Sequence, residues 1–195
     1  MDDVSVTAFR EASGFLVEVV RLVPDQGWDA PGLGDWSVHE LVAHANRGHT
    51  TIEEYLLRPQ RPQPPGSSYF SDEAIAARGR EAVRALGDDP ARAVAAASAA
   101  VLALIEKSPP EATIGSPAGT MTLAQFLPSR TAELTIHGLD ISRAIGADVP
   151  APRTALREAS YTWRSVPRAS PGRTYCSRCP AAGRSRPATP STRPS

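Results

Sequence analysis

The chain has 195 residues, enough for one domain with a short extension, and its 41% of apolar residues can supply an ordinary core. Its 21 Lys and Arg residues balance its 21 Asp and Glu residues, so charge gives no argument for binding nucleic acid or an anionic membrane. The chain lacks a run of 18 apolar residues, and the acidic start Met1-Asp2-Asp3 is unlike a signal peptide. We therefore expect a cytoplasmic protein with neither a nucleic-acid nor a membrane partner.

The first predicted helix covers residues 4–23, where apolar side chains recur at helical spacing and form a broad face. Pro24 and Gly27 end this helix, because proline and glycine both interrupt helical backbone. A loop rich in glycine and proline follows at residues 28–36. It contains two tryptophans, which favours a loop held against the core.

A second helix is predicted at residues 38–57. Ser37 and Glu40 form the pattern of a capping box, in which each side chain accepts a hydrogen bond from the other residue's backbone N–H. His44 lies on the flank of the apolar face of this helix. His39 points to the opposite side and is expected to face solvent. A single histidine beside an apolar face is more often structural than a metal ligand, so His44 alone decides nothing.

The middle of the chain contains further helices. Residues 58–68 are rich in proline and lack periodicity, which predicts an exposed loop. Helical spacing returns at residues 72–86 and 91–107, and the break between them leaves two alternatives, two separate helices or one bent helix. Residues 113–121 have the pattern of a short extended pair around a turn.

The central predicted helix covers residues 123–145 and carries an unusual group of polar residues. One edge of its apolar stripe is lined by Arg130, Glu133, His137 and Asp140. Glu133 and His137 are four residues apart, so both side chains leave the same face one turn apart and can share a metal ion. The alternative is a surface network of charge pairs, which is common at this spacing.

The end of the chain changes character. A last helix is predicted at residues 153–159, and residues 160–195 then lose every apolar period and become rich in Arg, Pro, Ser and Thr. One interpretation is a natural disordered tail. The other is a shifted reading frame in a GC-rich gene, since re-reading the implied codons one base earlier permits apolar residues that continue the last helix. In that case the CxxC pair Cys176 and Cys179 has no function.

The predicted fold class is all-α. Long helices joined by loops of medium length favour a four-helix bundle over residues 1–159, followed by the irregular C-terminal tail at 160–195. Metal sites in such bundles are built from side chains on facing helices. A metal site that includes both His44 and Glu133 therefore requires the two helices that carry them to face each other.

Two stretches together resemble a known family. Residues 36–44 resemble the motif W-[ST]-x-x-x-[LV]-x-x-H of the mycothiol-dependent maleylpyruvate isomerases, a branch of the DinB-like bundles. Residues 130–141 resemble the second motif of that family, R-x-x-E-x-x-x-H-x-x-D-[LI]. The resemblance implies a divalent metal, usually zinc, held by His44, Glu133 and His137. Two imidazoles and one carboxylate leave open coordination positions, the pattern of a catalytic site.

The resemblance also implies a reaction. The metal would bind a low-molecular-weight thiol such as mycothiol as the thiolate, which adds to an electrophilic small molecule for cis–trans isomerisation or S-transfer. Asp140 would orient a ligand and Arg130 would stabilise Glu133 or meet an acidic substrate, although both can also serve only as pairing partners. Two further alternatives are a non-catalytic metal-binding or stress-response module, and a truncated inactive product that lacks the family's C-terminal ending.

Overall fold

The structure is a computed structural model that describes residues 3–64 and 66–165, and these contain six α-helices, one 3-10 turn and one hairpin. This confirms the predicted all-α class. The elements are α1 (Asp3–Arg21), α2 (Val38–Leu57), η1 (Ser68–Phe70), α3 (Asp72–Leu86), α4 (Pro90–Lys107), β1 (Thr113–Ser116), β2 (Gly119–Thr122), α5 (Leu123–Ala144) and α6 (Arg153–Ser165). None of the helices in the described ranges combines the length and the apolar character that crossing a membrane requires.

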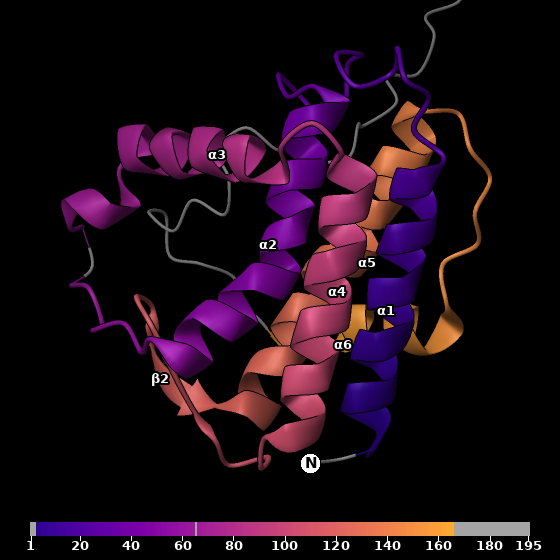
Figure 1. The fold of residues 1–195 in the computed structure, drawn as a ribbon. Coiled ribbons are helices and arrows are strands. Elements are labelled where there is room, and N and C mark those ends of the chain that lie inside the picture. Colours follow the sequence, from indigo (N-terminus) through magenta and orange to yellow (C-terminus); the bar gives the residue numbers. More distant parts are fainter. Residues whose placement is uncertain (1–2, 65, 166–195) are drawn as a thin grey trace, which may run out of the picture.

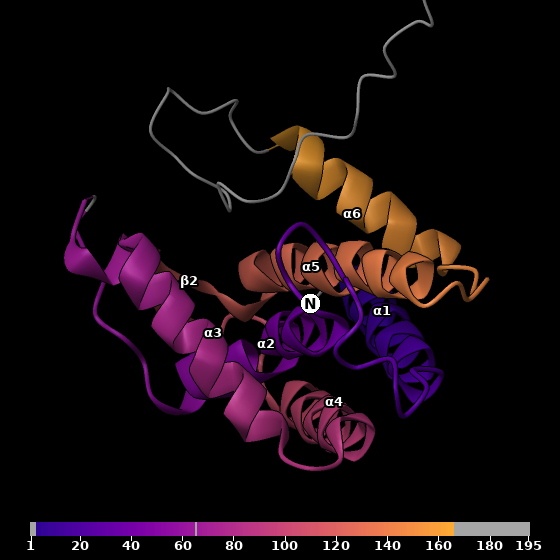
Figure 2. The same cartoon turned by 90° about the horizontal axis from the view of Figure 1, so that it is seen from above.

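Four long helices form the bundle. Helix α1 packs against α5, α5 against α2, α2 against α4, and α4 against α1, which closes a ring around one core (Figure 1). Helix α3 lies outside this ring against α2, and α6 lies outside it against α5 and α1 (Figure 2). The two predicted ligand-bearing helices are thus each packed against one helix outside the ring, α2 against α3 and α5 against α6.

The core is apolar and continuous through the ring. Burying a large aliphatic or aromatic side chain stabilises the fold by about 1.5–3 kcal/mol relative to leaving it exposed. Every bundle helix contributes such side chains; the largest fully buried ones include Phe9, Leu16, Leu41, Ile52, Ile105, Leu123, Leu127, Leu134 and Ile141. The periodic apolar positions in the sequence are thus the positions that hold the ring together.

The starts of three bundle helices, α2, α4 and α5, are fixed by local hydrogen bonds. Ser37 and Glu40 form the predicted capping box at the start of α2, with Ser37 N donating to Glu40 Oε2 at 2.8 Å. Thr122 caps α5. Asp89 caps α4, whose first residue is Pro90. Each cap satisfies a backbone N–H that the helix leaves without a partner.

The β1–β2 hairpin positions the start of α5. Its strands pair antiparallel, with Ile114 opposite Met121, as the predicted extended pair requires. Immediately after the hairpin, Leu123 N donates to Ala112 O at 2.8 Å, so the first turn of α5 is tied to the segment before β1. Helix α5 also contains Pro128, which lies near its start and does not end the helix.

Of the two alternatives for residues 72–86 and 91–107, the structure has two separate helices, because Gly87 adopts a positive φ of 62° between them and α3 leaves the bundle. Two predictions need correction. Helix α6 continues beyond the predicted end at 159 to Ser165. The prediction that His39 faces solvent is wrong. Its ring packs edge-on against Trp28, with ring centroids 5.7 Å apart, and its Nε2 is buried. Residues 166–195, with the CxxC pair and the predicted tail, lie outside the described residues.

Candidate metal centre

The predicted site residues come from two helices that approach each other closely. His44 lies on α2, and Glu133 and His137 lie one turn apart on α5. Close to them, a Cβ atom at Gly48 of α2 would come within 2.7 Å of Leu134 of α5. The missing side chain at position 48 therefore lets α2 approach α5 closely enough for side chains of the two helices to meet.

The three predicted ligands converge on one point. The Nε2 atom of His44 is 3.6 Å from Oε2 of Glu133, and the Nε2 atom of His137 is 3.4 Å from the same oxygen. One ligand atom from each residue lies within 4.8 Å of the other two. In a tetrahedral site with bonds near 2.1 Å, neighbouring ligand atoms lie about 3.4 Å apart, and the two distances from Glu133 Oε2 match this value.

Asp140 contacts the other nitrogen of His137. Its Oδ2 atom is 3.4 Å from His137 Nδ1, which is buried and has no partner with full hydrogen-bond geometry among the described residues. A metal-binding histidine usually presents its second ring nitrogen to a carboxylate, which fixes the tautomer and the orientation of the ring. Asp140 occupies the position that such a carboxylate requires, with Nε2 of the same ring directed at Glu133.

Arg130 lies on the far side of Glu133 from the histidines. Its Nη2 atom is 3.9 Å from Glu133 Oε1, while the histidines approach Oε2. The guanidinium also lies over the Phe126 ring at 4.9 Å, and its Nε donates to Ser129 Oγ at 3.2 Å. Arg130 is thus held beside the centre, where it leaves Oε2 of Glu133 free for a metal ion.

The electrostatics of the centre compensate for its burial. Burial acts to raise the pKa of Glu133, but hydrogen bonds from His137 and His44 and the charge of Arg130 outweigh it and hold that pKa well below its usual range. Burial acts to lower the pKa of His137, but the carboxylates of Asp140 and Glu133 outweigh it and raise that pKa to about 9. Glu133 is therefore a carboxylate, the form in which it binds a metal.

The centre is open to solvent from one side. The His44 side chain is 36% exposed, Glu133 is 26% exposed and His137 is 12% exposed. The accessible edge is therefore the α2 side, where His44 lies. Two imidazoles and one carboxylate would leave a fourth position for water or a thiol, and the exposure of His44 gives that position a route to solvent.

Sequence reasoning missed two features close to the predicted ligands. The Trp36 ring lies against the His44 ring, with centroids 4.8 Å apart and an interplanar angle of 42°. Deeper in the core, His49 Nε2 is 2.9 Å from Ser13 Oγ and its Nδ1 is 3.0 Å from Asn46 Oδ1. The sequence identified Trp36 as a motif residue, but its contact with His44 depends on how the loop folds. The buried hydrogen bonds of His49 join α1 to α2 and therefore have no local sequence pattern.

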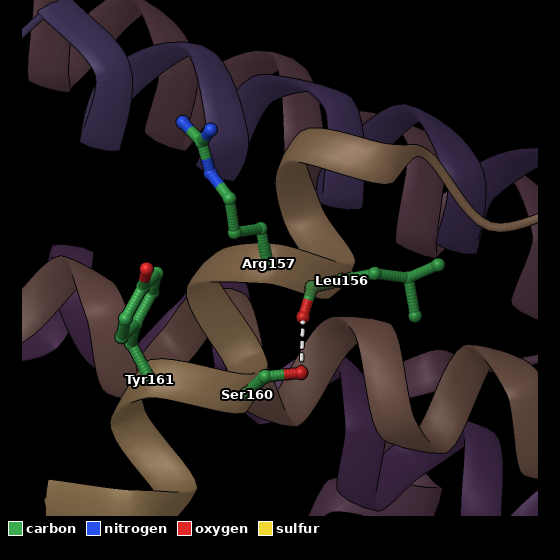
Figure 3. A pocket seen from close by; sticks show the side chains of 4 residues that line it. All are labelled: Leu156, Arg157, Ser160 and Tyr161. Atoms are coloured by element: carbon green, nitrogen blue, oxygen red, sulfur yellow. Dashed lines mark hydrogen bonds between the residues drawn. The ribbon is translucent and has the colours of Figure 1, made fainter.

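The surface hollow shown in Figure 3 is separate from this centre. It has a volume of about 290 Å³ and is lined by Leu156, Arg157, Ser160 and Tyr161, all from α6. The hydrogen bond drawn there, from Ser160 Oγ to Leu156 O at 2.8 Å, lies within the helix itself. None of the predicted site residues lines this hollow, so it adds nothing to the metal centre.

The structure brings all five predicted site residues together on α2 and α5. Their roles as ligands, orienting group and anion contact stay predictions. The family model described as the mycothiol maleylpyruvate isomerase N-terminal domain matches residues 9–142, which is more than half of the chain and includes every predicted site residue. A search of curated proteins and a search of solved structures gave no significant match.

Proposed function

Because the chain belongs to the mycothiol maleylpyruvate isomerase N-terminal domain family, we propose that it binds one divalent metal ion and uses it in thiol-dependent chemistry on an electrophilic small molecule. The proposed ligands are His44, Glu133 and His137, and the proposed metal is zinc. The proposed co-substrate is mycothiol or a similar low-molecular-weight thiol.

One observation carries this proposal. The Nε2 atoms of His44 and His137 approach the same oxygen of Glu133, at 3.6 Å and 3.4 Å, from two different helices. Arg130 lies beside the other oxygen of Glu133, so the positive side chain and the two imidazoles approach different oxygens of this carboxylate. Two imidazole nitrogens and one carboxylate oxygen at these separations supply the ligand types of a catalytic zinc site, which supports a metal ion held among them.

The proposal assigns a role to the metal ion and to each of the two residues beside its ligands, Asp140 and Arg130. A bound divalent ion would supply Lewis acidity that favours the thiolate form of the thiol at neutral pH. Asp140 would hold the His137 ring with its Nε2 directed at the ion. Arg130 would hold Glu133 in place through Oε1 and would present a positive charge to an anionic substrate beside the centre.

Isomerisation requires only a reversible addition. The thiolate sulfur donates an electron pair to one alkene carbon, the C–S bond forms, and the π electrons move to the conjugated carbonyl oxygen. The former double bond is now single and rotates. When the electrons return, the double bond re-forms and the thiolate leaves, so neither an oxidant nor a net proton is needed. Protonation of the adduct before the thiolate leaves gives S-transfer instead.

A direct assay of the adduct tests the proposal. The protein is incubated with mycothiol and a cis-unsaturated diacid, with Zn²⁺ and after chelation, and both the trans product and the thioether are measured. We expect turnover that needs the metal and the thiol and is lost in Glu133→Ala. Zinc binding without either product would contradict the thiol chemistry while leaving the metal centre intact.

A non-catalytic metal-binding module is the second candidate. The observation in its favour is that Arg130, Glu133, His137 and Asp140 form a connected chain of ion pairs, all on α5, so the centre is electrostatically balanced without a substrate. The same assay separates the two candidates, because this module would bind the metal but would form neither the trans product nor the thioether.

A further inference from the structure

The two histidines of the centre are supported in different ways. His137 has Asp140 at its second ring nitrogen, at 3.4 Å. His44 has an ion pair with Glu133 and two ring contacts, but among the described residues its Nδ1 receives no hydrogen-bond partner. A histidine that binds metal normally needs its free nitrogen held, since otherwise the ring rotates about its side-chain bonds. Among the described residues, the contacts beside the Glu133 ion pair that can orient the His44 ring are its two ring contacts.

The Trp36 ring is in a position to do so. Its centroid is 4.8 Å from that of His44, within the range of packed aromatic pairs, and the two planes are tilted by 42°. The ring of His137 packs edge-on against the His44 ring, with centroids 4.9 Å apart. His44 is thus confined between the indole and the second histidine.

Hydrogen bonds hold the backbone on both sides of Trp36 in place. Trp36 N donates to Leu33 O at 3.1 Å, and Trp36 O accepts from Gly32 N at 2.8 Å. The next residue, Ser37, caps α2 and forms a β-bridge with Pro31. A Cβ atom at Gly32 would come within 3.0 Å of Trp36 O and 2.8 Å of Ser37 O, so glycine is required for the loop to close this tightly. The loop therefore presents the indole in a fixed place.

We propose that Trp36 is a positioning residue that holds the His44 imidazole for metal binding by ring packing, in place of the hydrogen bond that supports His137. This inference rests on the proposed metal centre. It implies that the loop between α1 and α2 is part of the metal site although it supplies no ligand. The capping box of α2 begins immediately after Trp36 and fixes the start of the helix that carries His44.

The test compares Co²⁺ affinity and the Co²⁺ absorption spectrum in the full chain and four variants. Trp36→Ala removes the ring, and Trp36→Phe keeps an aromatic ring on His44. Trp28→Ala is the matched control, because Trp28 belongs to the same loop but packs on His39. His44→Ala marks complete loss of the ligand. Circular dichroism of each variant without metal verifies the helical fold.

We expect Trp36→Ala to weaken Co²⁺ binding about tenfold, the lower end of the effect of losing a residue that orients a ligand. Trp36→Phe should restore most of the affinity and the wild-type spectrum, and Trp28→Ala should change neither. Equal affinity in Trp36→Ala and wild type would overturn the inference. Equal weakening in Trp28→Ala and Trp36→Ala would also overturn it, because the loss would then come from the loop as a whole.

Two further outcomes are decided by the same measurements. If Trp36→Ala does not fold, Trp36→Leu replaces it, and equal affinities of the leucine and phenylalanine variants would overturn the inference. If the wild-type chain itself binds no Co²⁺, the proposed metal centre fails, and with it the role of Trp36. That result is distinct from a failure of Trp36 alone, in which wild type binds and the substitution has no effect.

Discussion

His44 and Glu133 lie on different helices, far apart in the sequence, yet Nε2 of the first is 3.6 Å from Oε2 of the second. This distance depends on the packing of α2 against α5, and that packing depends on the missing side chain at Gly48. The geometry of the candidate metal centre is therefore a property of one helix–helix contact, and we expect changes at that contact to be measurable as changes in metal affinity.

Substitution of Gly48 by alanine tests this dependence. The new Cβ atom would lie 2.7 Å from the fully buried side chain of Leu134, so either that side chain has to shift within the packed core or α2 has to move away from α5. We expect a loss of about 1–3 kcal/mol in the free energy of unfolding, as for other overpacked cores, together with weaker metal binding. Urea unfolding and Zn²⁺ titration measure the two effects.

Gly14→Ala is the matched control for this substitution. Gly14 lies in α1 with nothing within 4 Å of its added Cβ atom, so alanine should stabilise the helix by up to about 1 kcal/mol and leave metal binding unchanged. If Gly48→Ala kept both its stability and its metal affinity, the close approach of α2 and α5 would not control the centre.

Asp140→Asn tests the orienting carboxylate. The asparagine keeps the shape of the side chain but removes the negative charge that lies 3.4 Å from His137 Nδ1. We expect metal affinity to fall about tenfold while the helical content stays the same. A competition titration with a chromophoric chelator measures the affinity.

Arg143→Gln provides the comparison for Asp140→Asn. Arg143 pairs with the other oxygen of Asp140 at 3.3 Å, but its own side chain is 78% exposed. An exposed ion pair contributes little, so this variant should bind metal as wild type does. Equal losses in both variants would assign the effect to the surface ion pair and not to the contact with His137.

Metal removal should lower the thermal stability of the wild-type chain. A ligand that binds only the folded state stabilises it by about 2.7 kcal/mol at 100 times its Kd, which corresponds to roughly 5–10 °C in Tm for a domain of this size. We expect a chelator to abolish this increase. His44→Ala should show no Zn²⁺-dependent shift, whereas His39→Ala, which alters a histidine packed on Trp28, should keep it. A full shift in His44→Ala would rule out His44 as a ligand.

The buried histidine His49 predicts a pH dependence of stability. Burial lowers the pKa of His49 from 6.5 to about 4, so the unfolded chain takes up a proton at higher pH than the folded chain does. The stabilisation is complete above pH 6.5 and is lost as the pH falls from 6.5 through 4, with a total on the order of 3 kcal/mol. The free energy of unfolding of the chelated protein, measured across this range, tests the prediction.

His49→Gln isolates the contribution of this histidine from other titrating groups. The difference in stability between wild type and His49→Gln should shrink as the pH falls, because only wild type loses the buried neutral imidazole hydrogen-bonded to Ser13 and Asn46. Parallel pH curves for the two proteins would contradict the assignment.

Local patterns in the sequence were sufficient to predict most of the helices. The capping box at Ser37 and Glu40 acts within one turn, so spacing alone predicts it. The last helix was different. The sequence predicts its end at 159 because the composition changes there, but α6 continues to Ser165.

The candidate site was partly predictable for the same reason. Glu133, His137 and Asp140 share one face of one helix, and helical spacing brings them together. The approach of His44 depends on how α2 packs, and only the family motif connected it with Glu133 before the fold was known. The contact of Trp36 with His44 depends on a folded loop, and the buried pair of Ser13 and His49 joins α1 to α2; neither has a local signature.

Metal content is the measurement that tests the central claim most directly. The wild-type chain, His44→Ala and Glu133→Ala are purified under identical conditions and analysed for divalent metals by mass spectrometry, with circular dichroism to verify folding. We predict close to one ion per chain in wild type and none in either variant, since each substitution removes one of only three ligands. A folded wild-type chain without metal, or variants that keep a full complement, would contradict the three-ligand centre.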